Sequence, residues 1–292
     1  MVNNLEKSVL ELIRKTSTSL PRDVVSSLKN ALKNEKNARA KECLEVMLEN
    51  NEMAKLKKQP ICQDTGNLIF KVLCPIKTDH GKIEAAIKKA VAKATKEGIL
   101  RKNSINAVTG VNSGDNLGPG TPQIKYENSR GSKTYIYLIL KGGGCENVSR
   151  QYSVMEHGFV SEDHFVAAEK AILGAVQKAQ GFGCSPGFLG VCLGGDRETG
   201  YAHAKNQLFR KLNDKNTSSG LAKMEESILK KCNSLNIGPM GMGGNSTVLS
   251  VKIGHLNRVA ASYFVTVSYM CWAFRRQGVL LDKSFNISKF LY

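Results

Sequence analysis

Apolar residues recur at helical spacing throughout the first part of the chain. Leu5, Val9 and Leu12 fall three or four positions apart, as on a helix that turns one face toward a core. Two further stretches of this kind follow, so residues 1–58 are predicted to form a helical layer. The same spacing predicts later helices from Ile83 to Gly98, from about Ser161 to Val176, and at 221–235.

Uninterrupted apolar runs are interspersed with these helices and predict buried strands. The runs are residues 68–73, 134–140, 247–253 and a longer one that ends near Cys271. The alternation predicts a mixed α/β (α+β) fold, a single domain with a helical N-terminal layer and a central mixed sheet that carries glycine-rich loops. We divide it into the layer 1–58, a core 59–282 and a tail 283–292.

Composition and charge narrow the class of protein. The 292 residues are 41% hydrophobic and carry 42 Lys and Arg against 25 Asp and Glu, a net charge of +17. This is globular composition, without an apolar run long enough to span a bilayer and without a secretory signal, so we expect a cytoplasmic protein that does not bind membranes. The charge fits a solvated lysine-rich surface, attraction of small anions, or nucleic-acid binding. Aromatic residues make up only 7% of the chain, which makes nucleic-acid binding the least favoured of the three.

Glycine-rich loops that also contain cysteine are the unusual feature of the sequence. Cys62 lies in PICQDTG, Cys145 follows Gly142–Gly144, Cys184 lies in GFGCSPG, and Cys271 ends an apolar strand. Glycine allows a backbone to approach a ligand closely, so these cysteines suit metal binding or nucleophilic chemistry as well as simple burial. Three others lie on helix faces or at a strand end and are predicted to be small buried residues: Cys43, Cys74 and Cys232.

Several familiar motifs are absent from the sequence. The eight cysteines include no CxxC pair, and in a chain without a signal they are expected to be reduced thiols. The glycines after Lys141 lack the Gly-Lys-Ser/Thr of a phosphate-binding loop, and no dinucleotide fingerprint follows. No histidine occurs in a motif that would make it the partner of a nucleophilic cysteine. A long loop at residues 103–123, rich in Asn, Ser, Gly, Thr and Pro, is a candidate functional segment.

Five segments, in this order, carry a resemblance to a known family: ICQDTG, KGGGCEN, GCSPGFLGVCLGG, LNIGPMGMGGNSTVL and YMCWAFRR. Together they resemble the class I, iron–sulfur-dependent hydro-lyases, specifically the α subunit of a two-subunit class I fumarate hydratase or L(+)-tartrate dehydratase. The resemblance implies a [4Fe–4S] cluster held by Cys62, Cys184 and Cys271. Three thiolates on four irons leave one iron open, which can act as a Lewis acid toward a small dicarboxylic hydroxy acid.

The resemblance also implies roles for residues near the first cysteine motif. Gln63 and Asp64 fall where the family places catalytic groups that contact the substrate, and Arg101 matches an arginine that grips a substrate carboxylate, for which its planar fork is suited. The backbone N–H groups of Gly142–Gly144 would face the substrate. Without the resemblance, Asp64 would be interpreted as a turn or cap residue and Arg101 as a solvated charge at a helix end.

The sequence departs from the family pattern in places that bear on the substrate. Val259 stands where relatives often have histidine, with His255 four residues earlier. Cys145 is typical of tartrate dehydratase α chains, whereas Glu146-Asn147 is typical of fumarases, so fumarate/malate and tartrate both stay open as substrates.

The family also places the catalytic base outside the segment that this chain resembles. The resemblance therefore implies a β subunit that supplies the base, with α2β2 assembly. Two alternatives from other classes are a non-catalytic cluster-binding or nucleic-acid-binding protein, and an enzyme with a nucleophilic cysteine.

Overall fold

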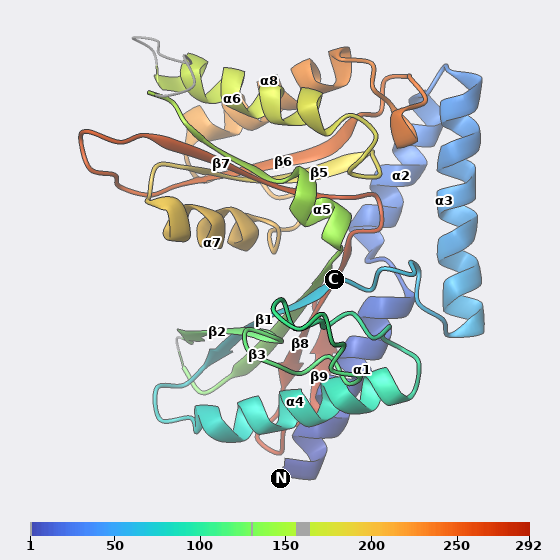
Figure 1. The fold of residues 1–292 in the computed structure, drawn as a ribbon, viewed down its shortest axis with the longest axis vertical. Coiled ribbons are helices and arrows are strands. Elements are labelled where there is room, and N and C mark those ends of the chain that lie inside the picture. The colour runs from blue at the N-terminus through green and yellow to red at the C-terminus, as the bar shows by residue number, and fades with distance from the viewer. Residues whose placement is uncertain (1, 130, 156–163) are drawn as a thin grey trace. The chain divides into compact units, whose positions relative to one another are not determined.

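The structure is a computed structural model that describes residues 2–129, 131–155 and 164–292. It divides into two compact units that interleave along the chain (Figure 1). The first comprises Met1–Arg22, Glu49–Gly143 and Ala273–Tyr292, and the second Asp23–Leu48 and Gly144–Trp272. Helices and two mixed sheets confirm the predicted mixed α/β class.

The first unit is built on a five-stranded sheet in the order β2-β1-β3-β8-β9. The strands are β1 (Asn67–Cys74), β2 (Gln123–Asn128), β3 (Thr134–Lys141), β8 (Arg275–Leu281) and β9 (Ile287–Phe290). Strands β1 and β2 are parallel, and the other neighbours are antiparallel. Helices α1 (Val2–Thr18) and α4 (His80–Lys96) pack on each other, and their apolar faces bury a core with the sheet. That core is the physical reason for the helical spacing of Leu5, Val9 and Leu12.

The second unit has a four-stranded sheet in the order β4-β7-β5-β6. The strands are β4 (Arg150–Ser153), β5 (Gly187–Leu193), β6 (Val248–His255) and β7 (Phe264–Met270). Helices α6 (His164–Ala179) and α8 (Ser219–Ser234) lie over one face and α7 (Arg197–Gln207) over the other (Figure 1). Strand β5 is therefore buried along its whole length, as expected for a strand covered on both faces.

Three further helices complete the fold: α2 (Arg22–Asn34), α3 (Ala38–Lys57) and the short α5 (Gly143–Val148). A 3-10 turn, η1, spans Pro239–Gly241. Glu35, between α2 and α3, is only 2% exposed. Its carboxylate accepts hydrogen bonds from the backbone N–H groups of Lys36, Asn37 and Asn245. Burial raises the pKa of Glu35, but these hydrogen bonds outweigh burial and hold it below its usual value.

Most of the predicted elements are present. The segment 1–58 contains the three helices α1–α3, the runs 68–73 and 134–140 lie within β1 and β3, and the run 247–253 overlaps β6. The segment 283–292, expected to be a tail, contains β9, which pairs with β8. The predicted helix start at Ser161 lies outside the described residues. None of the helices in the described ranges combines the length and apolar content needed to cross a bilayer.

Candidate active site

Three segments meet at one edge of the five-stranded sheet, the edge formed by the start of β1, the end of β3 and the start of β8. Antiparallel pairing places Asn67, at the start of β1, opposite Lys141, at the end of β3. In the same way it places Leu140 opposite Arg275, at the start of β8. The turn before β1 carries Cys62, Gln63 and Asp64, so the topology brings this turn, the glycines after β3 and the start of β8 together.

Asp64 is at the centre of this edge. Its Oδ2 accepts a hydrogen bond from the backbone N–H of Gly143 at 2.6 Å. Its Oδ1 accepts one from the N–H of Gly66 at 2.9 Å and one from Nδ2 of Asn103 at 3.3 Å. Three donors on one carboxylate fix its orientation. The structure therefore places the predicted Asp64 beside the predicted glycine loop, although the N–H of Gly143 serves Asp64 itself.

Glycine is required at two positions for this arrangement. Gly66 has φ +77°, and a Cβ there would lie 2.4 Å from the carbonyl carbon and oxygen of Lys141. At Gly142 a Cβ would lie 2.9 Å from Oδ2 of Asp64. Both distances are shorter than real Cβ contacts, so these glycines allow the turn before β1 and the end of β3 to approach each other closely.

Arg275 stabilises the turn that carries Asp64. It is 1% exposed, and its Nη1 donates a hydrogen bond to the backbone oxygen of Asp64 at 2.8 Å. Its Nε has no hydrogen-bond partner among the described residues. A buried guanidinium is costly unless it is paired, and no role for Arg275 is predicted from the sequence. Its place in YMCWAFRR, directly after the third cysteine motif, is the signal that could have drawn attention to it.

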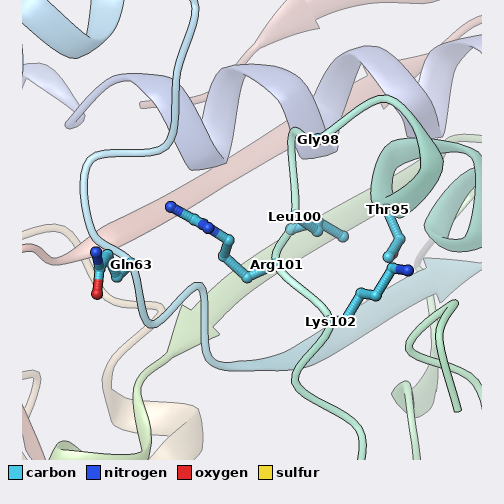
Figure 2. A pocket seen from close by; sticks show the side chains of 6 residues that line it. All are labelled: Gln63, Thr95, Gly98, Leu100, Arg101 and Lys102. Carbon is cyan, nitrogen blue, oxygen red and sulfur yellow. The ribbon is translucent and has the colours of Figure 1, made fainter. Parts of the chain in front are cut away.

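Gln63 and Arg101 line the same cavity, of about 550 Å³ (Figure 2). Thr95, Gly98, Leu100 and Lys102 complete the lining. Figure 2 shows the guanidinium of Arg101 extending toward the segment that carries Gln63, while Lys102 lies on the other side of Leu100. Gln63 and Arg101 are exposed, so both are accessible to a small ligand. Two cationic side chains on the lining suit an anionic one.

Cys62 precedes these residues in the first unit. It is half-buried, and the turn that carries it is anchored because the N–H of Ile61 donates to the backbone oxygen of Ser17 at 3.0 Å. Its neighbour Ile61 is buried. The thiol therefore lies on a short segment fixed at one end by α1 and at the other by β1.

Cys184 and Cys271 are brought together within the second unit. The N–H of Trp272 donates to the backbone oxygen of Cys184 at 3.1 Å. Cys184 is half-buried and has φ +51°, a left-handed conformation that is rare for cysteine and costs free energy. Burial raises the pKa of Tyr269, which precedes Cys271 by two residues, well above its usual value, and Cys271 and Cys184 add to this.

Cys145 lies in the same neighbourhood of the second unit. Its Sγ accepts a hydrogen bond from the N–H of Cys271 at 3.3 Å, and it is 3% exposed. Glu146, the next residue, forms an ion pair with Lys205 at 2.7 Å. Val259 is 69% exposed, and His255 is exposed at the end of β6.

The other cysteines are buried or lie on helix surfaces. Cys74 and Cys232 are fully buried, as predicted, whereas Cys43 is half-buried. The structure places Nε2 of His80 3.5 Å from Sγ of Cys74, a pairing that the sequence did not indicate. Burial raises the pKa of the Cys74 thiol. This disfavours the thiolate that a nucleophile requires.

The motif cysteines carry thiols, the type of ligand that iron–sulfur clusters take. Among the described residues, no group of three or more His, Cys, Asp or Glu side chains could hold one ion. A cubane makes a different demand, since each thiolate binds its own iron. All eight cysteines lie in the described part of the chain and are thiols. Within the second unit the adjacent pair Cys184 and Cys271 offers two such thiols, and Cys62 offers a third in the first unit.

Comparison with known proteins gives a consistent result. A sequence profile described as fumarate hydratase (Fumerase) matches residues 6–279. A provisionally named class I fumarate hydratase from Geobacillus stearothermophilus is 46% identical over all of this chain, which spans 58% of that relative's length. A provisionally named L(+)-tartrate dehydratase subunit alpha from Methanocaldococcus jannaschii is 34% identical, with 92% of this chain and 94% of the relative aligned. The L(+)-tartrate dehydratase subunit alpha of Escherichia coli K12 is 31% identical, with 96% and 91% aligned.

Proposed function

Because the chain belongs to the fumarate hydratase (Fumerase) family, we propose that it is a hydro-lyase that adds water to, or removes it from, a small dicarboxylic acid. Interconversion of fumarate and malate is the leading reaction. The observation that carries the proposal is the edge of the first unit's sheet, where a fixed Asp64 carboxylate follows Gln63, which lines a cationic cavity together with Arg101.

The residues of this chain bind and orient the substrate in the proposed reaction. The guanidinium of Arg101 pairs with one substrate carboxylate, for which its planar fork is suited. Removal of a proton next to a carboxylate builds negative charge on that carboxylate, and a cation held against it lowers the barrier. Gln63 and Asp64 contact the substrate hydroxyl by hydrogen bonds. The three donors on Asp64 hold its carboxylate in place before the substrate arrives.

Cys62, Cys184 and Cys271 are the proposed ligands of a [4Fe–4S] cluster. When bound, a cluster with one open iron supplies a Lewis acid that makes hydroxide a better leaving group. Anaerobic reconstitution with iron and sulfide should give a brown protein with broad visible absorption, and Cys62→Ser should abolish this colour. Cys43→Ser, a change to a half-buried helix cysteine outside the motifs, is the matched control and should keep it.

Tartrate is the second candidate substrate. Full-length similarity to subunits named for L(+)-tartrate dehydratase favours it, as does Cys145, whose Sγ contacts the backbone of Cys271. The higher identity to the fumarate hydratase relative favours fumarate and malate. Anaerobic assays on malate, fumarate and both tartrate enantiomers decide between them, because each reaction predicts turnover of a different acid.

A β subunit is the proposed partner, in an α2β2 assembly. Two of the relatives are named as alpha subunits, and the fumarate hydratase relative is longer than this chain. We propose that the partner supplies the catalytic base. The chain should therefore be inactive alone and active when expressed with its partner, and full turnover by the lone chain would refute this. The thiols suit a reducing compartment, so we place the enzyme in the cytoplasm.

A non-catalytic nucleic-acid-binding role is the alternative from another class. The net charge of +17 is the observation that keeps it open. Tight DNA binding with a steep salt dependence, together with no turnover of any of the four acids by the complete enzyme, would favour it.

A further inference from the structure

Asn116 lies inside the long loop and is 2% exposed. Its Oδ1 accepts hydrogen bonds from the N–H groups of Asn103 at 2.7 Å and Ser104 at 3.1 Å. Its Nδ2 donates to Oγ1 of Thr95 at 2.9 Å and to the backbone oxygen of Arg101 at 2.7 Å. One buried amide thus holds the last turn of α4 and the backbone of residues 101–104.

Asparagine suits this position for two reasons. The residue has φ +63°, a left-handed conformation that asparagine adopts more readily than most residues. The side chain must also accept two hydrogen bonds on one atom and donate two from another, which only an amide of this length can do. An aspartate in its place would present an oxygen to the carbonyl of Arg101. A side chain without polar atoms would remove the partner of that carbonyl and of the N–H groups of Asn103 and Ser104.

The segment that Asn116 holds is also bonded to the turn before β1. The N–H of Arg101 donates to Oγ1 of Thr65 at 3.1 Å. Nδ2 of Asn103 donates to Oδ1 of Asp64 and to Oγ1 of Thr65, both at 3.3 Å. Arg101 and Asn103 are themselves exposed, so little packing holds their backbone. The amide of Asn116 makes three hydrogen bonds to this backbone, more than Asn112, whose Nδ2 donates to the oxygen of Lys102, or Ser113, whose N–H donates to the oxygen of Ser104.

We propose that Asn116 is a positioning residue that fixes the backbone of residues 101–104 and thereby aims Arg101 into the cavity and Asn103 at Asp64. This rests on the proposed function, in which Arg101 binds a substrate carboxylate. Asn116 does not touch the substrate. Without the Asn116 amide the guanidinium of Arg101 would occupy many positions. Substrate binding would then be weaker, because fixing the guanidinium in one orientation costs entropy.

The test uses the complete enzyme with its partner and two substitutions. Asn116→Asp keeps the shape and removes the Nδ2 donors, and Asn116→Gly removes the amide while accepting the positive φ. Asn106→Asp is the matched control, because Asn106 also accepts backbone hydrogen bonds, from Val108 and Thr109, but at the exposed tip of the same loop.

Trypsin cleavage after Arg101 and Lys102, mapped by mass spectrometry, reports the order of this segment without any reference to activity. Both Asn116 variants should be cut there about tenfold faster, the factor expected from loss of a net hydrogen bond, and Asn106→Asp should match the wild type. An unchanged rate at these two bonds in both Asn116 variants would overturn the proposal, even if activity fell.

The KM for the dicarboxylate gives the second readout. Asn116→Asp should raise KM about tenfold in the wild-type background and change it by less than about twofold when Arg101 is already alanine, since residues that act through one another are not additive. An equal rise in both backgrounds would overturn positioning through Arg101. If trypsin cleaves the Asn116 variants faster as predicted but the wild-type enzyme turns over no dicarboxylate, the proposed function is refuted, and with it the substrate part of this inference.

Discussion

Replacing Gly142 by alanine should disable the Asp64 carboxylate while leaving the fold intact. A Cβ at residue 142 would lie 2.9 Å from Oδ2 of Asp64 and 3.9 Å from Nη2 of Arg275. The first distance is too short, so the carboxylate must move. Moving the carboxylate costs free energy, because its Oδ2 accepts a hydrogen bond from the N–H of Gly143 at 2.6 Å and its Oδ1 accepts one from the N–H of Gly66 at 2.9 Å.

The expected magnitudes separate an effect on stability from an effect on catalysis. Loss of one hydrogen bond to a charged group costs about 1.5–3 kcal/mol, which is less than the usual stability of a domain, about 5–15 kcal/mol. The variant should therefore fold, with a lower melting temperature. A reacting group displaced by about 1 Å costs on the order of 10²-fold in rate. We expect kcat for malate dehydration to fall about 100-fold.

Gly143→Ala is the matched control for this prediction. Its Cβ would lie 3.6 Å from the same oxygen of Asp64, an ordinary contact, and its N–H would be retained. The assay uses the complete enzyme with its partner and follows fumarate by its ultraviolet absorbance under anaerobic conditions, with rates normalised to the iron content of each preparation. Gly143→Ala should retain kcat within about threefold, because no atom must move. Equal losses in the two variants, or full activity in Gly142→Ala, would refute the assigned role of the Asp64 carboxylate.

Three further predictions concern stability. Gly66→Ala should lower the free energy of unfolding by about 2–4 kcal/mol in urea titrations, through the clash with Lys141 and the positive φ; an unchanged midpoint would contradict this. Glu35→Gln should lower the melting temperature near neutral pH, and the difference from wild type should shrink as pH falls below about 4.5. The pKa of Glu35 is lowered in the folded state, so the stability that its carboxylate contributes is lost only as the carboxylate protonates. A difference independent of pH would contradict this. Burial raises the pKa of Cys232 from 9.0 to about 12, so wild-type stability should fall between these pH values about 1.4 kcal/mol per pH unit more steeply than that of Cys232→Ala; parallel profiles would contradict it.

The helices and central strands could be predicted because their signal is local. Leu5, Val9 and Leu12 repeat with the period of a helix, and apolar and aromatic residues dominate the run 134–140. Residues close together in the sequence therefore predict which positions are buried. The same rule missed β8, which begins with Arg275 and Arg276. Both arginines are fully buried, and apart from the motif YMCWAFRR that contains them nothing in their immediate sequence distinguishes them from surface charges. Their strand forms because β3 and β9 pair with it on either side, which is a tertiary effect.

The missed short elements have related causes. Helix α5 starts in the Gly142–Gly144 run, whose intrinsic preference is against helix. Strands β4 and β9 have only four residues each, too few for a period to show. The long loop was identified by composition, but Asn116 was one of many polar residues in it. Asn116 differs from Asn106 and Asn112 because it is buried and they are exposed. The order of residue types along the loop does not show this difference in burial.

The candidate site shows why motif resemblance and physical geometry give different kinds of information. The resemblance pointed to Asp64 as one residue of ICQDTG, whereas two of the contacts that fix its position come from far along the chain: Gly143 is 79 residues away and Arg275, which binds its backbone oxygen, is 211 residues away. Those contacts exist because β1, β3 and β8 are consecutive antiparallel neighbours, so the start of β1, the end of β3 and the start of β8 must share one edge. A slip of β3 against β1 by one residue would exchange its faces and remove the N–H of Gly143 from Asp64. The chemistry of the turn is therefore set by strand register, and substitutions in β3 that keep every motif residue can still abolish it.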